Sequence, residues 1–297
     1  MVYNKYLLIT ITIFIILIAT YRVVKNMVLY RQFTFNPEKY RNFYAKLTSY
    51  LVDSNDLVSN IYVKSSNNIV LDTCFIQNKF SDMCIIFFHG EKGNLSMRFD
   101  MIKFLYGFGS VLIFDYRTYG KSTGNVIDLS ALGLLDDANA IWDYVRNTLG
   151  YQSNKISLFG ESLGCSVAIE LASKLSKTLN NQYYPHSIIL TSPVCSLASL
   201  LKSKFKNFNL DFLNPIIPYI ETEYNTIDAI KYINYSIKII IAHSQDNDYI
   251  PYSEGKTLYD SISNNHPNVK FIDIMGKNDG IGLTDDYIYS VSDILQD

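Results

Sequence analysis

The pentapeptide Gly160-Glu161-Ser162-Leu163-Gly164 constrains this chain more than any other feature of the sequence. A strand-like run, Lys155–Phe159, precedes it, and a helix-like pattern begins at Leu163. Two flanking glycines allow a sharp turn and a close approach of helix to strand, and such a turn lifts a serine hydroxyl above the edge of a sheet. A glycine–serine–glycine pattern recurs by chance, but the context on both sides predicts that Ser162 is a nucleophile with an exposed hydroxyl.

Around this turn, strand-like and helix-like stretches alternate along the chain. Seven strands are predicted, several of them continuously apolar, as strands buried on both faces should be: Ile69–Ile76, Met83–Phe88, Ser110–Phe114, Lys155–Phe159, Ser187–Leu190, Ile237–Ala242 and Val269–Ile274. Helices are predicted at Asn94–Tyr106, Leu129–Leu149, Leu163–Thr178, Ser253–Ser263 and Thr284–Leu295. The alternation predicts an α/β fold with a mostly parallel, doubly wound sheet, whose ligands bind beyond the carboxyl ends of the strands.

Composition narrows the function classes. The 297 residues contain no linker-like run or repeat, which indicates one globular domain after an N-terminal segment. A net charge of −2 gives no electrostatic case for binding nucleic acid. We expect no metal and no cofactor, because the sequence has no Walker pattern, no GxGxxG after a first strand and no zinc-ligand spacing. The four cysteines are interpreted as buried free thiols: Cys74, Cys84, Cys165 and Cys195.

The N-terminal segment, residues 1–24, is predicted to be a single-pass transmembrane anchor. It is uncharged from Tyr6 to Tyr21, and a helix needs roughly 20 apolar residues to cross a bilayer core. A signal peptide is the rival interpretation, but no small-x-small cleavage site follows. The basic residues after the segment favour a cytoplasmic domain. Residues 25–56 are interpreted as a basic and aromatic connector near the membrane surface.

The remaining residues, 57–297, form the predicted folded domain. Within it, residues 195–225 carry Pro215, Pro218 and many aromatic side chains between two predicted strands, where a lid or cap would be inserted. Two N-x-S sequons begin at Asn94 and Asn234. Glycans on either would contradict the cytoplasmic assignment, because glycosylation takes place on luminal domains.

Three motifs occur in a fixed order: His89-Gly90-x-x-Gly93-Asn94, Asp115-Tyr-Arg-x-Tyr-Gly-Lys-Ser-Thr-Gly124 and Gly160-Glu-Ser-Leu-Gly164. With these spacings the chain resembles the membrane-anchored α/β-hydrolase-domain family, whose relatives include lysophospholipid lipases and protein depalmitoylases. The resemblance extends from about Leu57 to the C-terminus and includes the N-terminal anchor. It implies an α/β-hydrolase fold with an N-terminal transmembrane helix. It also implies a serine hydrolase of esters or thioesters that acts on lipid or acylated-protein substrates at a membrane.

The resemblance also implies roles for the first two motifs. In such hydrolases the loop after the strand Met83–Phe88 supplies one backbone N–H to the oxyanion hole, and the residue after the nucleophile supplies the other. These donors would be Glu91 and Leu163. His89, Asp115 and Arg117 are interpreted as residues that order the loops.

The other two members of a catalytic triad are replaced. In the family the acid follows the strand Ile237–Ala242, and its position falls here on Asn247. Asp246 and Asp248 flank it, and either could serve as an alternative acid, with Asp248 preferred. The family's base is a histidine after the last strand. This chain reads Gly276-Lys277-Asn278-Asp279 there, so Lys277 occupies the base position.

Three explanations remain open for the missing histidine. Another histidine could serve: His89 and His243 lie at carboxyl ends of strands, whereas His186 and His266 precede strands at the opposite edge of the sheet. Alternatively, Lys277 could act as the base, which requires loss of a proton that neighbouring carboxylates would hold in place. The third explanation is an inactive hydrolase fold that serves as a membrane-tethered binding or scaffold protein for an acyl chain or a partner protein.

Overall fold

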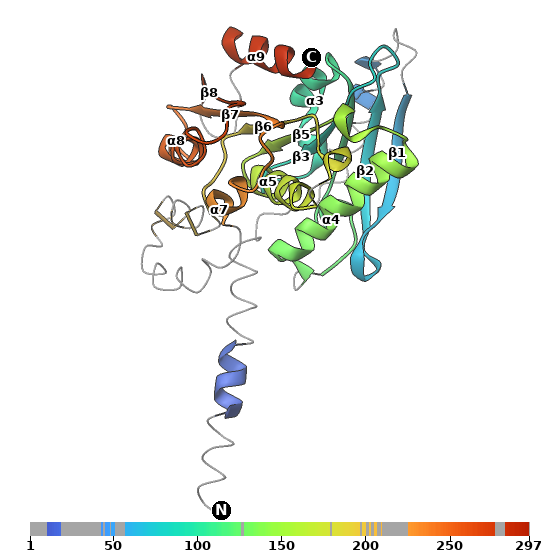
Figure 1. Ribbon diagram of the computed structural model, residues 1–297. Coiled ribbons are helices and arrows are strands. Elements are labelled where there is room, and N and C mark those ends of the chain that lie inside the picture. Colours follow the sequence, from blue (N-terminus) through green and yellow to red (C-terminus); the bar gives the residue numbers. More distant parts are fainter. Residues whose placement is uncertain are drawn as a thin grey trace, which may run out of the picture.

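The computed structural model describes residues 11–18, 43, 45–47, 49–50, 57–125, 128–178, 180–196, 198–199, 202, 205–206, 209, 225–276 and 283–296. Its centre is an eight-stranded sheet in the order β1-β2-β4-β3-β5-β6-β7-β8 (Figure 1). The strands are β1 (Leu57–Lys64), β2 (Val70–Gln77), β3 (Cys84–Phe88), β4 (Ser110–Phe114), β5 (Ile156–Glu161), β6 (Ser187–Thr191), β7 (Lys238–Ser244) and β8 (Val269–Ile274). β2 pairs antiparallel with β1 and β4, and the remaining pairs are parallel. The predicted mostly parallel sheet is confirmed.

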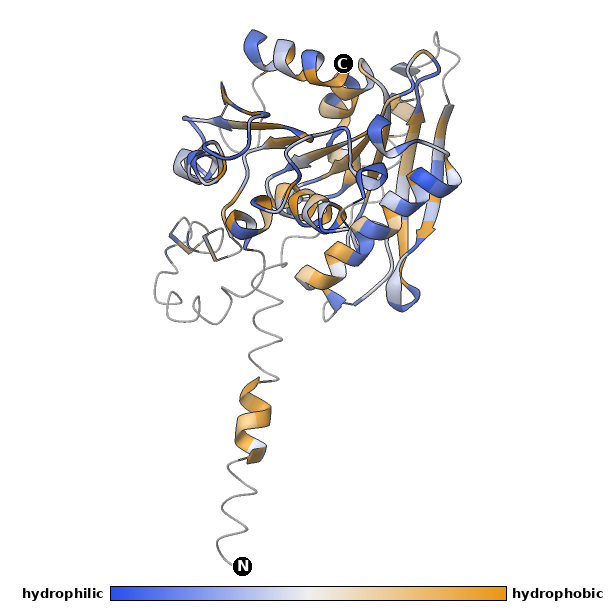
Figure 2. Cartoon of the chain, in the orientation of Figure 1, coloured by the Kyte–Doolittle hydropathy of each residue, from blue (hydrophilic) through white to orange (hydrophobic). Residues whose placement is uncertain are grey.

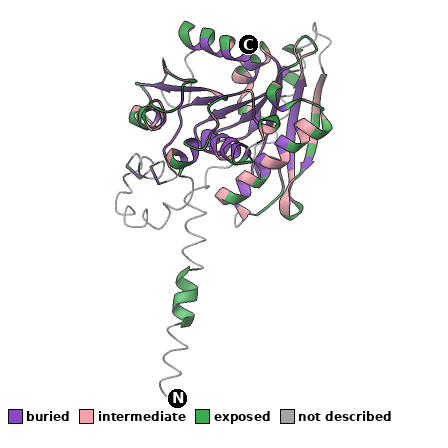
Figure 3. Cartoon of the chain, in the orientation of Figure 1, coloured by how far each residue is buried: buried purple, intermediate pink, exposed green. Residues whose placement is uncertain are grey.

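Helices cover both faces of the sheet. One face packs against α4 (Ala131–Asp143), α5 (Leu163–Ser176), α7 (Thr226–Ile230) and α8 (Tyr252–Asp260), and the other against α3 (Phe99–Tyr106) and α9 (Asp285–Gln296). Side chains alternate along a strand, so β3 sends Ile86 and Phe88 into one core and Ile85 and Phe87 into the other. The central strands and α5 are almost wholly buried (Figure 3) and mostly apolar (Figure 2).

Differences from the predicted elements lie mainly at the edges. β1 was not among the predicted strands, because Ser59 and Asn60 interrupt its apolar pattern; it is an edge strand that pairs with β2 alone. The predicted helix Leu129–Leu149 is α4 followed by a π-helical turn, Tyr144–Thr148. The five-residue α7 was also missed, since it is too short to show a helical period.

The predicted membrane anchor lies largely outside the described residues. Residues 11–18 are helical and apolar (Figure 2). Within the described part of the chain, no helix has both the length and the apolar character needed to cross a membrane. Most of the predicted connector and cap also lies outside the described residues.

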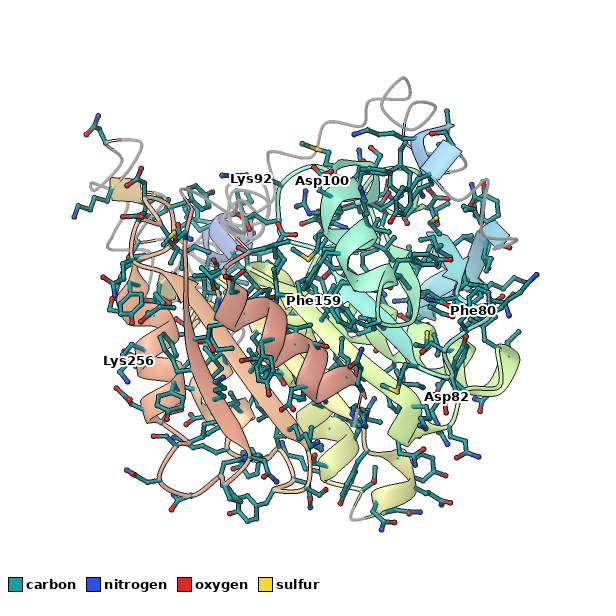
Figure 4. The ribbon with its side chains drawn as sticks, turned by 90° about the horizontal axis from the view of Figure 1, so that it is seen from above. Phe80, Asp82, Lys92, Asp100, Phe159 and Lys256 are labelled. Carbon is teal, nitrogen blue, oxygen red and sulfur yellow. The ribbon has the colours of Figure 1, made fainter. Side chains whose placement is uncertain are left out.

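The sheet order places four loops side by side. β3, β5, β6 and β7 are consecutive neighbours, and all pair in parallel. Their carboxyl ends therefore meet at one edge of the sheet, which is where an α/β sheet binds its ligands. In Figure 4, Lys92 lies beyond this end of β3, whereas Asp82 precedes the other end of the strand.

Candidate active site

Ser162 lies at the turn between β5 and α5, in a backbone conformation that serine rarely adopts. Its φ is 52° and its ψ is −117°, a region in which a side chain is strained and glycine is favoured. The Ser162 N–H donates to the Thr191 carbonyl at the end of β6, 2.9 Å away. The turn is thus held against the neighbouring strand, with Ser162 itself in the strained conformation.

Two glycines make the turn possible because neither has room for a side chain. A Cβ on Gly164 would overlap the carbonyl oxygen of Phe88 on β3. On Gly160 it would lie 2.7 Å from the Cα of Cys165 in the first turn of α5. Close packing of helix against strand, predicted from these glycines, is confirmed.

The Ser162 hydroxyl is hydrogen-bonded to a carboxylate. Ser162 Oγ donates to Glu91 Oε2 at 2.9 Å, across 71 positions of sequence. Neither side chain is open to solvent: Ser162 is 0% exposed and Glu91 2%. The expectation of an exposed hydroxyl was therefore wrong, because the loop after β3 brings Glu91 directly onto it.

Arg98, at the start of α3, connects the turn that carries Ser162 with the loop that carries Glu91. Its Nε lies 2.7 Å from Glu161 Oε2, next to Ser162. Its Nη2 donates to the Lys92 carbonyl, 2.9 Å away and adjacent to Glu91. One guanidinium thus links the turn that carries the serine to the loop that carries the glutamate.

His89 forms no hydrogen bond with Ser162. Its Nδ1 donates to the Gly90 carbonyl at 2.7 Å, and its Nε2 faces Asp115 Oδ1 at 3.4 Å. Burial lowers the pKa of His89 to about 3 and raises the pKa of Asp115 to about 8. Burial thus favours the neutral form of both the imidazole and the carboxyl group. Asp115 also accepts from the Leu95 N–H at 2.7 Å, which supports the interpretation of both residues as loop-ordering.

The other three histidines are also engaged away from the serine. His243 Nε2 donates to the Ile250 carbonyl at 3.0 Å, and burial lowers the pKa of its ring. His186 Nε2 lies 2.7 Å from the Ile294 carbonyl, and His266 Nε2 lies 3.3 Å from that of Asn234. All four histidines are within the described part of the chain, so a relocated histidine base has no support in the structure.

Asn247, at the predicted acid position, holds its own loop together. Its Oδ1 accepts from the N–H groups of Tyr249 and Ile250 at 2.9 and 2.8 Å. Its Nδ2 donates to Ser192 Oγ at 3.2 Å, and Ser192 follows directly after β6. The amide is 7% exposed. Asn247 is thus a neutral side chain that joins the loop after β7 to the end of β6. The Ser162 N–H donates to the same end of β6.

The remaining predicted site residues are less closely defined. Asp248 is exposed beside Asn247. Lys277 lies outside the described residues. Leu163 is the first residue of α5, where N–H groups have no partner inside the helix, and Glu91 follows β3 at the same edge. Both backbone groups remain predicted oxyanion donors.

Sequence reasoning missed the side chain of Glu91. Its position was singled out for its backbone N–H alone, and a glutamate in a loop carries no signal that it will point toward a serine 71 residues away. Pairing of β3 with β5, which matches Phe88 with Gly160, creates the contact. Only the register of two strands could have indicated it.

Comparison with known proteins shows which family the chain is similar to. A hydrolase family model described as serine aminopeptidase, S33, matches residues 81–233, just over half of the chain. An uncharacterized protein of Acanthamoeba polyphaga mimivirus is 44% identical over 274 residues, which cover 92% of each chain. Lysophosphatidylserine lipase ABHD12 of Xenopus tropicalis is 32% identical over 59% of this chain. This match spans only 45% of the lipase's own length.

Solved structures share the fold. The esterase Pf2001 of Pyrococcus furiosus superposes with a TM-score of 0.66 at 20% identity, covering 83% of this chain and 92% of the esterase. An alpha-beta hydrolase from Vibrio vulnificus gives 0.71 at 17% identity and covers 86% of both chains. At these identities the likeness is one of fold.

Proposed function

This chain belongs to the α/β-hydrolase family described by the serine aminopeptidase model, and we propose that it hydrolyses acyl esters or thioesters through Ser162. The observation that carries the proposal is the strained backbone of Ser162, with φ 52° and ψ −117°, between β5 and α5. Strain of this kind costs about 1–3 kcal/mol and persists at functional sites. A serine held there without a catalytic role would only destabilise the fold.

The proposed reaction has two halves. Ser162 Oγ attacks the acyl carbonyl carbon, and the alcohol or thiol leaves once the oxyanion collapses. Water then hydrolyses the acyl-serine and releases the carboxylic acid. The N–H groups of Leu163 and Glu91 would stabilise the oxyanion in each half.

The substrate class rests on the relatives. One is named a lysophosphatidylserine lipase and another an esterase, and both names describe cleavage of acyl esters. We extend the proposal to a lipid or acylated protein at a membrane, with residues 1–24 as anchor and the domain on the cytoplasmic side. The basic residues after the segment support that orientation.

The test is labelling by a fluorophosphonate probe, read by mass spectrometry, together with turnover of acyl esters and thioesters of increasing chain length. Wild-type protein should be labelled on Ser162. Ser162→Ala should lose both labelling and turnover. If wild type shows neither reaction across chain lengths and pH values, the hydrolase proposal fails.

The orientation has a separate test at Asn234. Asn94 is unsuited to it, because it is 1% exposed and its side chain accepts from the Ser96 N–H at 3.0 Å. Asn234 is partly exposed. Absence of a glycan on Asn234 in membrane-bound protein is expected, and a glycan there would place the domain in the lumen.

A second candidate function is an inactive binding or scaffold protein. The observation that favours it is Asn247, whose amide is engaged by Tyr249, Ile250 and Ser192 where an acid would be needed. The double variant Asn247→Asp with Lys277→His discriminates between the two candidates. If wild type is inert and the double variant turns over substrate, the scaffold function is supported. If wild type already turns over substrate as fast as the double variant, the scaffold function is excluded.

A further inference from the structure

The Ser162 hydroxyl donates to one side chain of the described chain, and that side chain is a carboxylate. Glu91 Oε2 lies 2.9 Å from Ser162 Oγ, within the range required of a general base and the proton it removes. The histidines, which would ordinarily fill this role, are bonded to backbone carbonyls elsewhere. We infer that Glu91 is the general base of this site, so that a serine–glutamate pair replaces the serine–histidine pair; this inference rests on the proposed hydrolase function.

The charge balance of the step suits a buried glutamate. As the bond from Ser162 Oγ to the carbonyl carbon forms, the hydroxyl proton passes to Glu91 and the carbonyl oxygen becomes an oxyanion. The negative charge of Glu91 thus moves to the substrate oxygen. The base is therefore neutral at the moment when a carboxylate would repel the oxyanion most strongly.

The same group completes the reaction. Protonated Glu91 gives its proton to the leaving alkoxide or thiolate, and the carboxylate is regenerated. It then takes a proton from water as the water oxygen attacks the acyl-serine, and it returns that proton to Ser162 Oγ when the carboxylic acid leaves. One ester and one water are consumed, and one acid and one alcohol or thiol are formed.

The surroundings hold the carboxylate in place for this role. Glu91 is 2% exposed, so bulk water does not compete for the Ser162 hydroxyl. Arg98 ties the loop of Glu91 to the turn of Ser162 through the Lys92 carbonyl and Glu161. Lys92 Nζ in turn lies 3.4 Å from the ring centroid of Tyr249, which holds the loop against the one after β7.

The test compares the rate of Ser162 labelling by the fluorophosphonate probe, and of ester turnover, among variants of the full chain. Glu91→Gln keeps the size and one acceptor oxygen but cannot accept a proton, so both rates should fall about 10²–10⁴-fold, the usual contribution of a general base. The matched control is Asp100→Asn, the same change on an exposed carboxylate of α3, which should leave both rates within about twofold.

Chemical rescue separates catalysis from structure. Glu91→Ala removes the carboxylate and leaves space beside Ser162, so added formate should raise the labelling rate of this variant by about tenfold or more; a merely structural role would show no such rescue. Glu91→Asp, which retracts the carboxylate, should fall between wild type and Glu91→Gln. These two variants keep the inference testable even if Glu91→Gln does not fold.

Failure of the inference differs from failure of the proposed function. If wild type is labelled on Ser162 and Glu91→Gln retains that rate, Glu91 is not the base and the hydrolase proposal stands. Glu91 is equally excluded as the base if Lys277→Met abolishes labelling while Glu91→Gln does not. If wild type itself neither labels nor turns over, both the hydrolase and its proposed base are refuted.

Discussion

Arg98 Nε lies 2.7 Å from Glu161 Oε2, and this ion pair joins the start of α3 to the residue before Ser162. Both side chains are mostly buried, 11% and 7% exposed. A buried charge left without its partner is costly, whereas removal of both charges leaves no unpaired charge behind. The pair therefore fixes the relative position of two loops that are 63 residues apart in the sequence.

Removal of Arg98 alone should destabilise the fold. Arg98→Met removes the ion pair to the buried Glu161 carboxylate, so the free energy of unfolding should fall by about 3 kcal/mol. Adding Glu161→Gln should restore at least half of that loss. Urea denaturation of Arg98→Met, Glu161→Gln and the double variant gives a double-mutant cycle. If the losses of the two single variants add up to the loss of the double variant, the two side chains are not coupled.

Gly164→Ala should be among the most damaging methyl additions at the described glycines. The new Cβ would overlap the Phe88 carbonyl oxygen, so helix and strand must separate, at a cost of about 3 kcal/mol. Gly150→Ala is the control: its φ of 81° is also strained for alanine, but no atom lies within 4 Å of the added Cβ. It should cost only about 1 kcal/mol, and equal losses in thermal unfolding would refute the steric argument.

Strain at Ser162 predicts an order of stability between two variants that lack the hydroxyl. Ser162→Gly and Ser162→Ala both lose the hydroxyl and its bond to Glu91, but only alanine keeps a Cβ at φ 52°. The glycine variant should therefore be more stable than the alanine variant by about 1 kcal/mol. An alanine variant that is the more stable of the two would mean that the turn is not strained.

Asn247 should tolerate a carboxylate but not an apolar side chain. In Asn247→Asp the carboxylate still accepts from Tyr249 N and Ile250 N, and the Ser192 hydroxyl can turn to donate to it, so stability should change by less than about 1 kcal/mol. Asn247→Leu leaves the buried N–H groups of Tyr249 and Ile250 without their acceptor, so the free energy of unfolding should fall by about 3 kcal/mol. Chemical denaturation distinguishes the two, and a leucine variant as stable as wild type would contradict the assigned hydrogen bonds.

Asp72 on β2 predicts a pH dependence of stability. Its carboxylate is buried with no hydrogen-bond partner among the described residues, and burial raises its pKa to about 6. The unfolded pKa is about 3.9, so the protonated folded form contributes stability that is fully present below pH 4. That contribution is lost as the pH rises through 6.

Asp72→Asn removes this titration. The free energy of unfolding of the variant, relative to wild type, should therefore rise by about 2–3 kcal/mol between pH 4 and pH 7. Parallel pH profiles of the two proteins would show that Asp72 does not titrate in that range.

Much of the fold was determined by local sequence. Apolar runs long enough for buried strands, a helical period between them and two glycines around Ser162 were sufficient to predict the parallel sheet and the sharp turn, because each depends on residues close together in the chain. The predicted loop-ordering role of Asp115 was also readable, since it follows a strand at the carboxyl edge. β1 and α7 were missed because an edge strand and a single helical turn leave weak patterns.

The partner of the serine was decided by tertiary structure alone. The sequence determined which residue sits on the turn, and it predicted that Lys277 and Asn247 occupy the base and acid positions of the family. It could not reveal that Glu91 lies on the hydroxyl, because that contact depends on the register of β3 against β5 and on the Arg98 bridge between their loops. Local pattern fixes backbone conformation, whereas the meeting of side chains from distant loops is fixed only when the sheet is assembled.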